Sequence, residues 1–225
     1  IFLSYLRISY LHLNMDNKYN LIVIGSGPGG YVAAIRASQL GMKVAIVEKE
    51  SLGGICLNWG CIPTKALLKS AQVFSYVNKS DDFGINVKNA SINFDSVINR
   101  SRSVADQMSK GVNFLMKKNK ISVFHGTGTL NKDGDVEVGN SGNKKIIKSK
   151  NIVLATGSKP IVPSFIEFDK KRVITSTEAL SLKECPKTLT IIGAGVIGLE
   201  LGSVFARLGA KVKVFDYSES IISFM

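Results

Sequence analysis

The sequence predicts an α/β fold made of two copies of one strand–turn–helix–strand unit, with the second unit incomplete. Residues 21–48 and 189–216 align with each other without a gap. Each copy opens with a short apolar run, which is typical of a strand buried on both faces of a parallel sheet. A Gly-x-Gly-x-x-Gly turn follows in both copies, and an acidic residue closes each of them. Apolar residues make up 45% of the 225-residue chain, which is enough for a sizeable core.

In the first copy, residues 21–24 are expected to form the opening strand and residues 25–30 the glycine turn. An Ala-rich helix follows and ends near Gly41, because glycine favours the end of a helix. Residues 43–47 form the second strand and place Glu48 at its carboxyl end.

The second copy repeats this order of elements. Strands are expected over residues 190–192 and 211–215, with the glycine turn at 193–198 and a helix that ends near Gly209. Asp216 takes the place that Glu48 has in the first copy.

The turn glycines have separate physical roles. The first glycine permits a tight turn, the second lets a pyrophosphate approach the backbone, and the third lets the helix pack closely on the strand. Phosphates would then lie at the positive N-terminus of the helix, and the closing acid would accept a hydrogen bond from a ribose hydroxyl. Asp216 would repel a 2′-phosphate, which favours NAD over NADP in the second copy. The six glycines are Gly25, Gly27, Gly30, Gly193, Gly195 and Gly198.

The region between the copies is expected to contain both helices and strands. Residues 63–78 and 94–118 have the apolar spacing of amphipathic helices. A buried strand over residues 150–154 leads into a turn of small residues at 155–157. Antiparallel strands joined by Gly-containing turns at 133–134 and 141–142 are expected over residues 121–130, 135–138 and 144–148.

Cys56 and Cys61 lie in a glycine-rich run that extends from Gly53 to Lys65. Their spacing does not match a four-ligand zinc set, so we expect no metal site. Residues five apart on an ideal helix are separated by about 7.5 Å along its axis, which is more than a disulfide tolerates. If the two cysteines pair, the backbone must therefore bend between them, and Gly60 and Pro63 would allow the bend. Two unrelated buried thiols are the alternative.

The composition limits the cellular setting. Three cysteines are too few for a secreted disulfide scaffold, which favours a reducing, cytoplasmic compartment, and Cys185 is expected to be structural. The net charge of +12 would suit an acidic partner, but the lysines are scattered and no aromatic residues alternate with them. We therefore expect neither a nucleic-acid nor a membrane partner, and keep a basic nucleic-acid-binding fragment as the non-enzyme alternative.

Residues 1–14 are expected to lie outside the fold. They are apolar but too short to span a bilayer, and no cleavage site follows them. Met15 resembles a natural start just before the first strand. A mitochondrial presequence, which would place the protein in the matrix, is the weaker interpretation because only one arginine is present.

Residues 16–225 resemble the flavin-dependent pyridine nucleotide–disulfide oxidoreductases. The run from Gly53 to Lys65 resembles the active-site signature of the branch that oxidises dihydrolipoamide. Enzymes of the glutathione type usually have Val and Lys where this chain has Leu57 and Thr64. The turn at residues 155–157 and the second glycine turn with Glu200 resemble the family too. Another flavin disulfide reductase, of mercuric or glutathione type, is the alternative within the family.

The resemblance implies two Rossmann-like units with three-layer ββα architecture, the first binding FAD and the second NAD. It places an FAD-binding domain at residues 15–157 and the start of an NAD-binding domain at 158–225. Glu48 would hold the adenosine ribose, and Gly128 would contact the adenine. Besides the turn glycines, the cofactor-binding set would comprise Pro28, Glu48, Lys49, Gly54, Cys56, Lys65, Gly128, Thr156, Gly157, Ser158, Val196, Ile197, Glu200 and Asp216.

The resemblance also implies the catalytic roles. Cys56 would exchange with dihydrolipoamide, Cys61 would be the thiolate next to the flavin, and Lys65 would pair with Glu200 near flavin N5. Electrons would pass from dihydrolipoamide through the disulfide and FAD to NAD⁺.

A catalytic base is not expected within this sequence. The two histidines are His12, which precedes the expected start, and His125, which is expected to be structural. In the family, the base lies in a C-terminal dimerisation domain, which would fall beyond residue 225. We therefore expect an inactive fragment of an enzyme that is a homodimer at full length. The partners implied are lipoyl domains of 2-oxo acid dehydrogenase complexes or of the glycine cleavage system.

Overall fold

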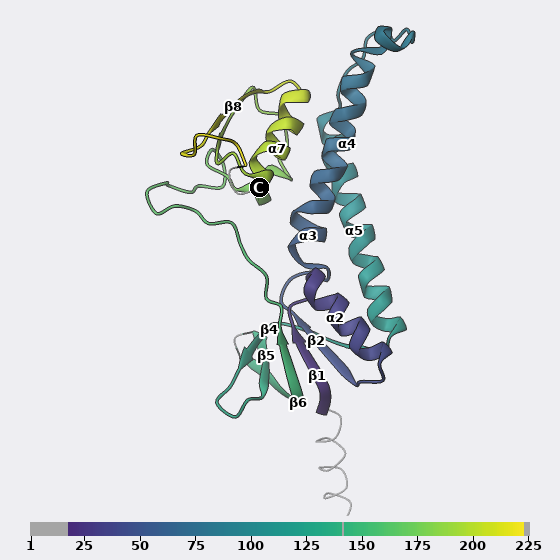
Figure 1. Cartoon of the computed structure of the whole chain (residues 1–225), viewed down its shortest axis with the longest axis vertical. Coiled ribbons are helices and arrows are strands. Elements are labelled where there is room, and N and C mark those ends of the chain that lie inside the picture. The colour runs from purple at the N-terminus through teal and green to yellow at the C-terminus, as the bar shows by residue number, and fades with distance from the viewer. Residues whose placement is uncertain (1–17, 141, 223–225) are drawn as a thin grey trace, which may run out of the picture. The chain divides into compact units, whose positions relative to one another are not determined.

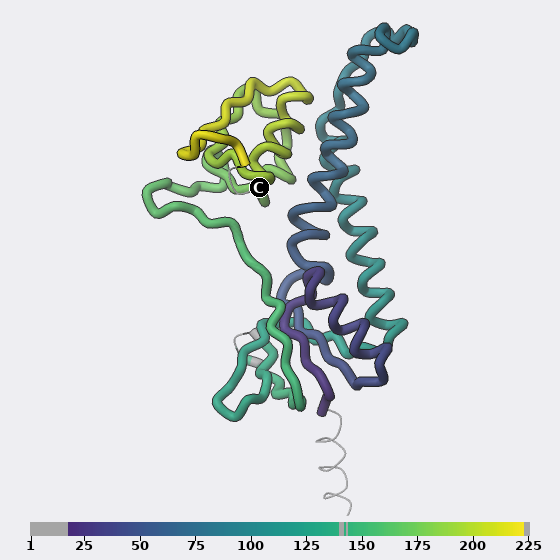
Figure 2. Tube along the Cα trace, viewed as in Figure 1, coloured from purple at the N-terminus to yellow at the C-terminus, as the bar shows by residue number. Residues whose placement is uncertain are grey.

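A computed structural model of the chain describes residues 18–140 and 142–222 (Figure 1). Among these residues, the chain forms two compact units. The first contains residues up to 56 and residues 108–158, and the second contains residues 57–107 and those from 159 onward. The chain therefore leaves the first unit twice (Figure 2). The expectations for residues 1–14, including His12, lie outside the described residues.

The first unit is built on a six-stranded sheet with the order β3-β2-β1-β6-β5-β4. Strands β1 (Lys18–Ile24), β2 (Val44–Glu48), β3 (Ser122–His125) and the second half of β6 (Asn143–Leu154) run parallel. Strand β5 (Val136–Asn140) pairs antiparallel with the first half of β6, and β4 (Thr127–Leu130) pairs antiparallel with β5 at the edge of the sheet.

The first unit has three layers, namely α2, the parallel strands and the antiparallel strands. Ile22 and Ile24 of β1, with Val47 of β2, share a core with Val136 and Val138 of the antiparallel strands. Because side chains alternate along a strand, the intervening residues of β1 and β2 point to the opposite face. Helix α2 (Pro28–Gln39) packs on β1 and β2 and buries three small residues, Gly30, Ala34 and Ala37. This arrangement confirms the predicted α/β, three-layer class (Figure 1).

Two strand predictions in this unit were wrong in detail. The single antiparallel strand expected over residues 121–130 is divided into β3 and β4 by Gly126, whose φ of +146° only glycine adopts readily. As a result, β3 pairs in parallel with β2. The strands expected at 144–148 and 150–154 are one strand, β6, because no turn residue separates them and each half has its own partner.

The second unit packs helices around an apolar core. Helices α4 (Cys61–Val77) and α5 (Phe94–Lys118) confirm the two helices predicted between the copies, although residues 108–118 of α5 belong to the first unit. Helix α7 (Val196–Arg207) follows β7 (Thr188–Ile192) and precedes β8 (Lys211–Phe215). The short helices are η1 (Ser80–Phe83), α6 (Ser176–Ala179) and α3 (Gly54–Trp59), of which residues 54–56 belong to the first unit. The buried core combines Leu67 and Ala71 of α4 with Val204 and Phe205 of α7.

The internal repeat predicted from the sequence is confirmed at the level of strand register. Leu21 pairs with Val44 in the first copy, and the matching Leu189 pairs with Val212 in the second. Both pairs of strands are parallel.

Within the part of the chain that the structure describes, no helix is both long enough and apolar enough to cross a membrane.

Candidate functional site

The first glycine turn lies at the carboxyl end of β1 and is closed by neighbouring backbone. Gly25 has a φ of +99° and donates its N–H to the Val47 carbonyl oxygen at 2.8 Å. A Cβ at Gly25 would lie 2.1 Å from the Ala155 oxygen, and one at Gly30 would lie 1.9 Å from the Gly25 oxygen. No side chain at either position fits, because the atoms in contact are backbone.

The N-terminus of α2, by contrast, is open. Its N-cap is Gly27, no side chain caps the helix, and Pro28 stands in the first turn. A Cβ at Gly27 or Gly29 would meet no atom within 4 Å. An uncapped helix N-terminus formed by glycines provides free N–H groups and a positive dipole end for an anion such as a pyrophosphate.

Glu48 is buried beside this turn and accepts several hydrogen bonds. Its Oε2 accepts from the Ser26 N–H at 2.9 Å and the Ser26 hydroxyl at 2.6 Å, and its Oε1 accepts from the Glu50 N–H at 2.9 Å. An ionised carboxylate has about four lone-pair sites, so these three bonds leave room for one ribose hydroxyl. Sequence reasoning missed Ser26. The available signal was a hydroxyl residue between the first two glycines of the turn.

The remaining FAD candidates in the first unit lie on the carboxyl side of its strands. A Cβ at Gly128 would lie 3.1 Å from side-chain carbons of Ile24 and of Val47, so glycine lets the backbone pack closely against these two side chains. Thr156, Gly157 and Ser158 follow the end of β6, and Gly157 has a φ of +70°. Lys49 lies 3.9 Å from the Glu50 carboxylate. These positions fit an FAD.

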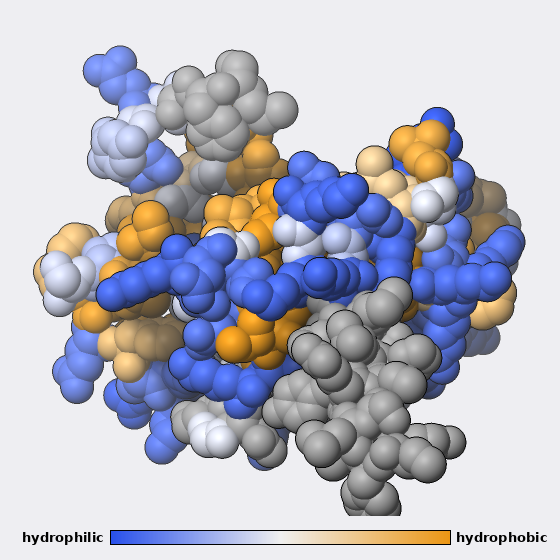
Figure 3. Space-filling model, turned by 90° about the horizontal axis from the view of Figure 1, so that it is seen from below, coloured by the Kyte–Doolittle hydropathy of each residue, from blue (hydrophilic) through white to orange (hydrophobic). Residues whose placement is uncertain are grey.

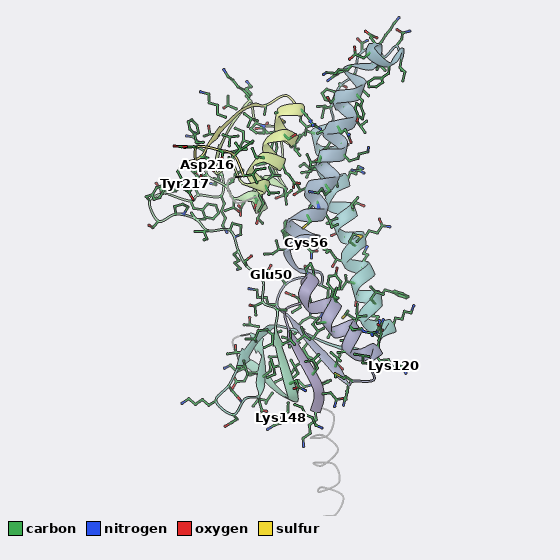
Figure 4. The ribbon with its side chains drawn as sticks, viewed as in Figure 1. Glu50, Cys56, Lys120, Lys148, Asp216 and Tyr217 are labelled. Atoms are coloured by element: carbon green, nitrogen blue, oxygen red, sulfur yellow. The ribbon has the colours of Figure 1, made fainter. Side chains whose placement is uncertain are left out.

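The cysteine segment packs directly on the first glycine turn. The Gly53 N–H donates to the Ser26 carbonyl oxygen at 3.0 Å, and a Cβ at Gly54 would lie 2.6 Å from the Gly27 Cα. Gly54 must therefore be glycine for the segment to approach this closely. Glu50 and Cys56, which are labelled in Figure 4, flank this contact in the sequence.

Cys56 and Cys61 form a disulfide, which confirms the pairing implied by the resemblance. Cys56 lies in α3, and Cys61 is the first residue of α4. The break between the helices is at Gly60, with φ −147° and ψ −110°. The role expected for Pro63 was wrong. It lies inside the first turn of α4, where the missing N–H of proline breaks no helical hydrogen bond.

The start of α4 is suited to an anionic sulfur. No side chain caps this 17-residue helix, and its first turn holds no acidic residue. A thiolate at a helix N-terminus is stabilised by the dipole and the free N–H groups. The longer helix α4 therefore favours a thiolate at Cys61 once the disulfide is reduced.

Lys65 and Glu200 form a hydrogen-bonded ion pair between α4 and α7, as predicted. Lys65 lies one helical turn after Cys61, and residues four apart share a face of a helix. The core formed by α4 and α7 holds the two helices together inside the second unit. Because the lysine side chain is 61% exposed, the ion pair itself contributes little to stability.

The second glycine turn repeats the contacts of the first. Gly193 donates its N–H to the Phe215 oxygen at 2.8 Å, and a Cβ at Gly198 would lie 2.2 Å from the Gly193 oxygen. Gly195 is the N-cap of α7, again with no side-chain cap, and Val196 and Ile197 begin that helix with exposed side chains.

Asp216 has the same contact with its turn that Glu48 has with the first. Its Oδ2 accepts from the Ala194 N–H at 2.6 Å and its Oδ1 accepts from the Ser218 N–H at 2.8 Å. These backbone N–H groups, with that of Ala194 first, lower the pKa of Asp216. The carboxylate is exposed next to Tyr217 (Figure 4) and keeps lone pairs for a ribose.

The other expected residues take no part in this arrangement. Cys185 is half-buried, its sulfur lies 3.7 Å from the Leu208 carbonyl oxygen, and burial raises the pKa of its thiol. His125 is exposed at the end of β3, and its structural role stays a prediction. Among the described residues, no group of three or more His, Cys, Asp or Glu could hold a metal ion.

Sequence reasoning also missed a contact to the residues between the cysteines. Arg102 of α5 donates from Nη2 to the Asn58 carbonyl oxygen at 2.7 Å, and its guanidinium carbon lies 4.7 Å from the centroid of the Trp59 ring. Nothing in the local sequence around Arg102 pointed to this contact, because it joins segments more than 40 residues apart.

Comparisons with known proteins agree with this geometry. Residues 19–225 match the family described as pyridine nucleotide-disulphide oxidoreductase. A dihydrolipoyl dehydrogenase of Bacillus subtilis is 44% identical over 217 residues, which cover 92% of this chain and 46% of the relative. A dihydrolipoyl dehydrogenase of Rhizobium etli is 46% identical, with 92% of this chain and 47% of the relative covered.

A solved structure gives the same result. The Cu(II) complex of the HOCl-induced flavoprotein disulfide reductase RclA from Escherichia coli has a TM-score of 0.79 and 28% identity. The match covers 92% of this chain and 44% of that protein. The chain thus spans about half the length of most of these relatives. With its disulfide, two glycine turns and matching fold, the chain belongs to the pyridine nucleotide-disulphide oxidoreductase family.

Proposed function

We propose that the chain supplies the disulfide and the dinucleotide-binding part of a dihydrolipoyl dehydrogenase. The observation that carries the proposal is the Cys56–Cys61 disulfide, held on a segment that packs against the first glycine turn. Curated relatives at 44–46% identity are dihydrolipoyl dehydrogenases, whereas the RclA structure is 28% identical. This difference favours dihydrolipoamide over the substrate of another disulfide reductase.

In this proposal, the first unit holds FAD. The N-terminus of α2 takes the pyrophosphate, Glu48 takes the adenosine ribose, and the backbone of Gly128 contacts the adenine. Thr156, Gly157 and Ser158 close over the cofactor. When bound, FAD supplies the two-electron chemistry that links a dithiol to a nicotinamide.

The cysteines have different tasks. Cys56 exchanges with dihydrolipoamide, so that the substrate becomes a cyclic disulfide while the Cys56–Cys61 bond takes up two electrons and two protons. Cys61 holds the thiolate at the start of α4. Lys65 is a fixed cation one turn away, kept in place by Glu200, and it would stabilise negative charge that develops beside it.

The second unit takes NAD in preference to NADP. Asp216 would accept from a ribose hydroxyl and repel a 2′-phosphate, as its lowered pKa keeps it ionised. Val196 and Ile197 line the approach to the N-terminus of α7. We further propose lipoyl domains of a 2-oxo acid dehydrogenase complex or of the glycine cleavage system as partners, a homodimeric enzyme and a cytoplasmic location.

The test begins with flavin binding by the purified chain. FAD should give a yellow complex that absorbs near ~450 nm, and dihydrolipoamide should reduce the Cys56–Cys61 disulfide in it. A colourless chain that resists dihydrolipoamide would contradict the proposal. NAD⁺ reduction by dihydrolipoamide is then measured at the full length of the curated relatives.

The charge pattern does not favour the nucleic-acid alternative. Lys144 pairs with Glu137 at 2.9 Å, and Lys148 pairs with Asp135 at 2.7 Å, so two lysines on the antiparallel strands have acidic partners. On the face drawn in Figure 3, hydrophilic residues are mixed with apolar ones. DNA binding that weakens steeply with salt, without bound flavin, would support that alternative instead.

A further inference from the structure

Arg102 contacts the two residues that end α3, between the cysteines. Its Nη2 donates to the Asn58 carbonyl oxygen at 2.7 Å, and its guanidinium carbon lies 4.7 Å from the centre of the Trp59 ring. Asn58 and Trp59 come after Cys56 and before Cys61. One side chain therefore holds both the backbone and a side chain of the four-residue link between the sulfurs.

This contact is partly buried, which makes it energetically demanding. Asn58 is only 8% exposed, and Arg102 Nε is a buried nitrogen for which the described residues offer no hydrogen-bond partner. Burial lowers the pKa of Arg102, and Asp106 opposes this effect. Burying a guanidinium costs free energy, which the charge-assisted hydrogen bond and the stacking on Trp59 offset. An arginine that made no structural contact would keep its guanidinium group in water.

The same face of α5 also contacts the segment before Cys56. Ser109 lies seven residues after Arg102, so the two side chains point from one stripe of the helix. The Ser109 hydroxyl donates to the Leu52 carbonyl oxygen at 2.8 Å. Helix α5 thus contacts a backbone carbonyl on each side of Cys56, at Leu52 within the first unit and at Asn58 within the second.

We propose that Arg102 is a positioning residue for the Cys56–Cys61 pair. Through the Asn58 carbonyl and the Trp59 ring, it holds the link in the conformation that brings both sulfurs together. The tendency of two thiols to form a disulfide depends on their effective concentration, which falls when the link between them gains freedom. The inference rests on the redox function proposed above.

The proposal separates geometry from charge. If position matters, Arg102→Lys should behave like Arg102→Met, because lysine keeps the charge but loses the planar, stacked fork. If only the positive charge matters, Arg102→Lys should behave like the native residue, and the positioning role is overturned.

The chain offers a matched control on the same helix. Arg100 donates from Nη1 to the Ala66 carbonyl oxygen at 2.9 Å and to the Ser70 hydroxyl at 3.3 Å. It therefore joins α5 to the middle of α4, beyond the cysteine link. Arg100→Met removes a comparable arginine–carbonyl contact and should not change the redox equilibrium of the pair.

The measurement is the dithiol–disulfide equilibrium of the full chain in a Cys185→Ser background, so that only Cys56 and Cys61 titrate. Each variant is equilibrated with mixtures of dihydrolipoamide and lipoamide, and its thiols are then trapped and counted by mass spectrometry. Arg102→Met and Arg102→Lys should each weaken disulfide formation about tenfold, which raises the midpoint potential by about 30 mV. Arg100→Met should stay within about twofold of the native value.

A second variant tests the contact from the other side and does not depend on Arg102 variants being well folded. Trp59→Leu should shift the equilibrium in the same direction, and the double variant Trp59→Leu, Arg102→Met should shift it less than the sum of the single effects. Thermal unfolding of every variant checks the fold.

The outcomes distinguish the two proposals. If the native disulfide is not reduced by dihydrolipoamide at all, the proposed function fails. If the native pair titrates but Arg102→Met leaves the equilibrium unchanged, or shifts it only as much as Arg100→Met, the positioning role is overturned. Additive shifts of Trp59→Leu and Arg102→Met would also overturn it.

Discussion

Cys56 and Cys61 have different surroundings although they share one bond. Cys61 begins the 17-residue helix α4, at the positive end of its dipole, whereas Cys56 lies inside the short helix α3. This difference favours Cys61 as the thiolate in the function proposed above. The sequence alone could place the two cysteines on a bend at Gly60. It could not show which of them opens a helix, because α3 was not expected.

Serine substitutions should separate the roles of the two thiols in the FAD-loaded chain. Cys56→Ser leaves Cys61 as a thiolate next to the flavin, so a long-wavelength charge-transfer absorbance should appear without added reductant. Cys61→Ser should lack this absorbance at every stage of reduction. Identical visible spectra of the two variants would contradict the assignment.

We expect Asp216 to set the preference between the two nicotinamide cofactors. Asp216→Arg removes one acceptor and one repulsion, so the preference for NADH over NADPH should fall by about ten- to a hundredfold. Dissociation constants of both cofactors, measured by calorimetry, check this. Asp216→Asn is the control. It loses the negative charge but keeps an oxygen acceptor, so its preference for NADH should lie between those of the native chain and the arginine variant. An unchanged preference in the arginine variant would place the ribose elsewhere.

Cys185 is expected to be a slow thiol. Burial raises the pKa of its thiol, so a smaller fraction is thiolate at neutral pH. After reduction of the chain, iodoacetamide should therefore label Cys185 more slowly than Cys61, and labelling of Cys185 should accelerate as the pH rises. Faster labelling of Cys185 than of Cys61 at neutral pH would contradict both assignments.

At the scale of elements, the glycine turn depends on backbone proximity. A Cβ at Gly30 would lie 1.9 Å from the Gly25 oxygen, whereas one at Gly29 would meet nothing within 4 Å. Gly30→Ala should therefore lower the free energy of unfolding by about 1–3 kcal/mol or more. Gly29→Ala, in the adjacent helical position, should leave it unchanged or raise it by up to about 1 kcal/mol. Urea unfolding of the FAD-free chain measures both.

The elements that sequence reasoning found are those with a strong local signal. Apolar patterns predicted β1, α2, α5, β7, α7 and β8. The repeat supported all of these except α5, which lies between the two copies. The division of β3 from β4 was missed because Gly126 gives no clear turn signal. Its left-handed conformation follows from pairing with two different partners, β2 and β5, which is a tertiary effect.

In the candidate site, too, residues with a recognisable sequence motif were predicted, and residues whose contacts depend on the fold were missed. The glycine turns, the closing acids and the ion pair of Lys65 with Glu200 belong to a recognisable motif and were predicted. Ser26 and Arg102 were not, because their contacts join residues that only the fold brings together. The continuous strand β6 was missed for the related reason that its two halves have separate partners.

At the scale of the whole molecule, the chain has two compact units, each with one glycine turn, and a disulfide whose cysteines lie on α3 and α4. The family match covers residues 19–225 of this chain. The dihydrolipoyl dehydrogenases that it resembles are about twice as long. The central claim is therefore tested best on what the chain itself contains, namely the disulfide and the first glycine turn.

The most direct measurement is an anaerobic titration of the FAD-loaded chain with dihydrolipoamide, followed by visible absorbance and thiol counting. We predict that the bound flavin, absorbing near ~450 nm, gains a long-wavelength absorbance as Cys56 and Cys61 become reduced, while Cys61→Ser shows no such change. A chain that binds no FAD, or one whose disulfide remains intact in excess dihydrolipoamide, would contradict the account.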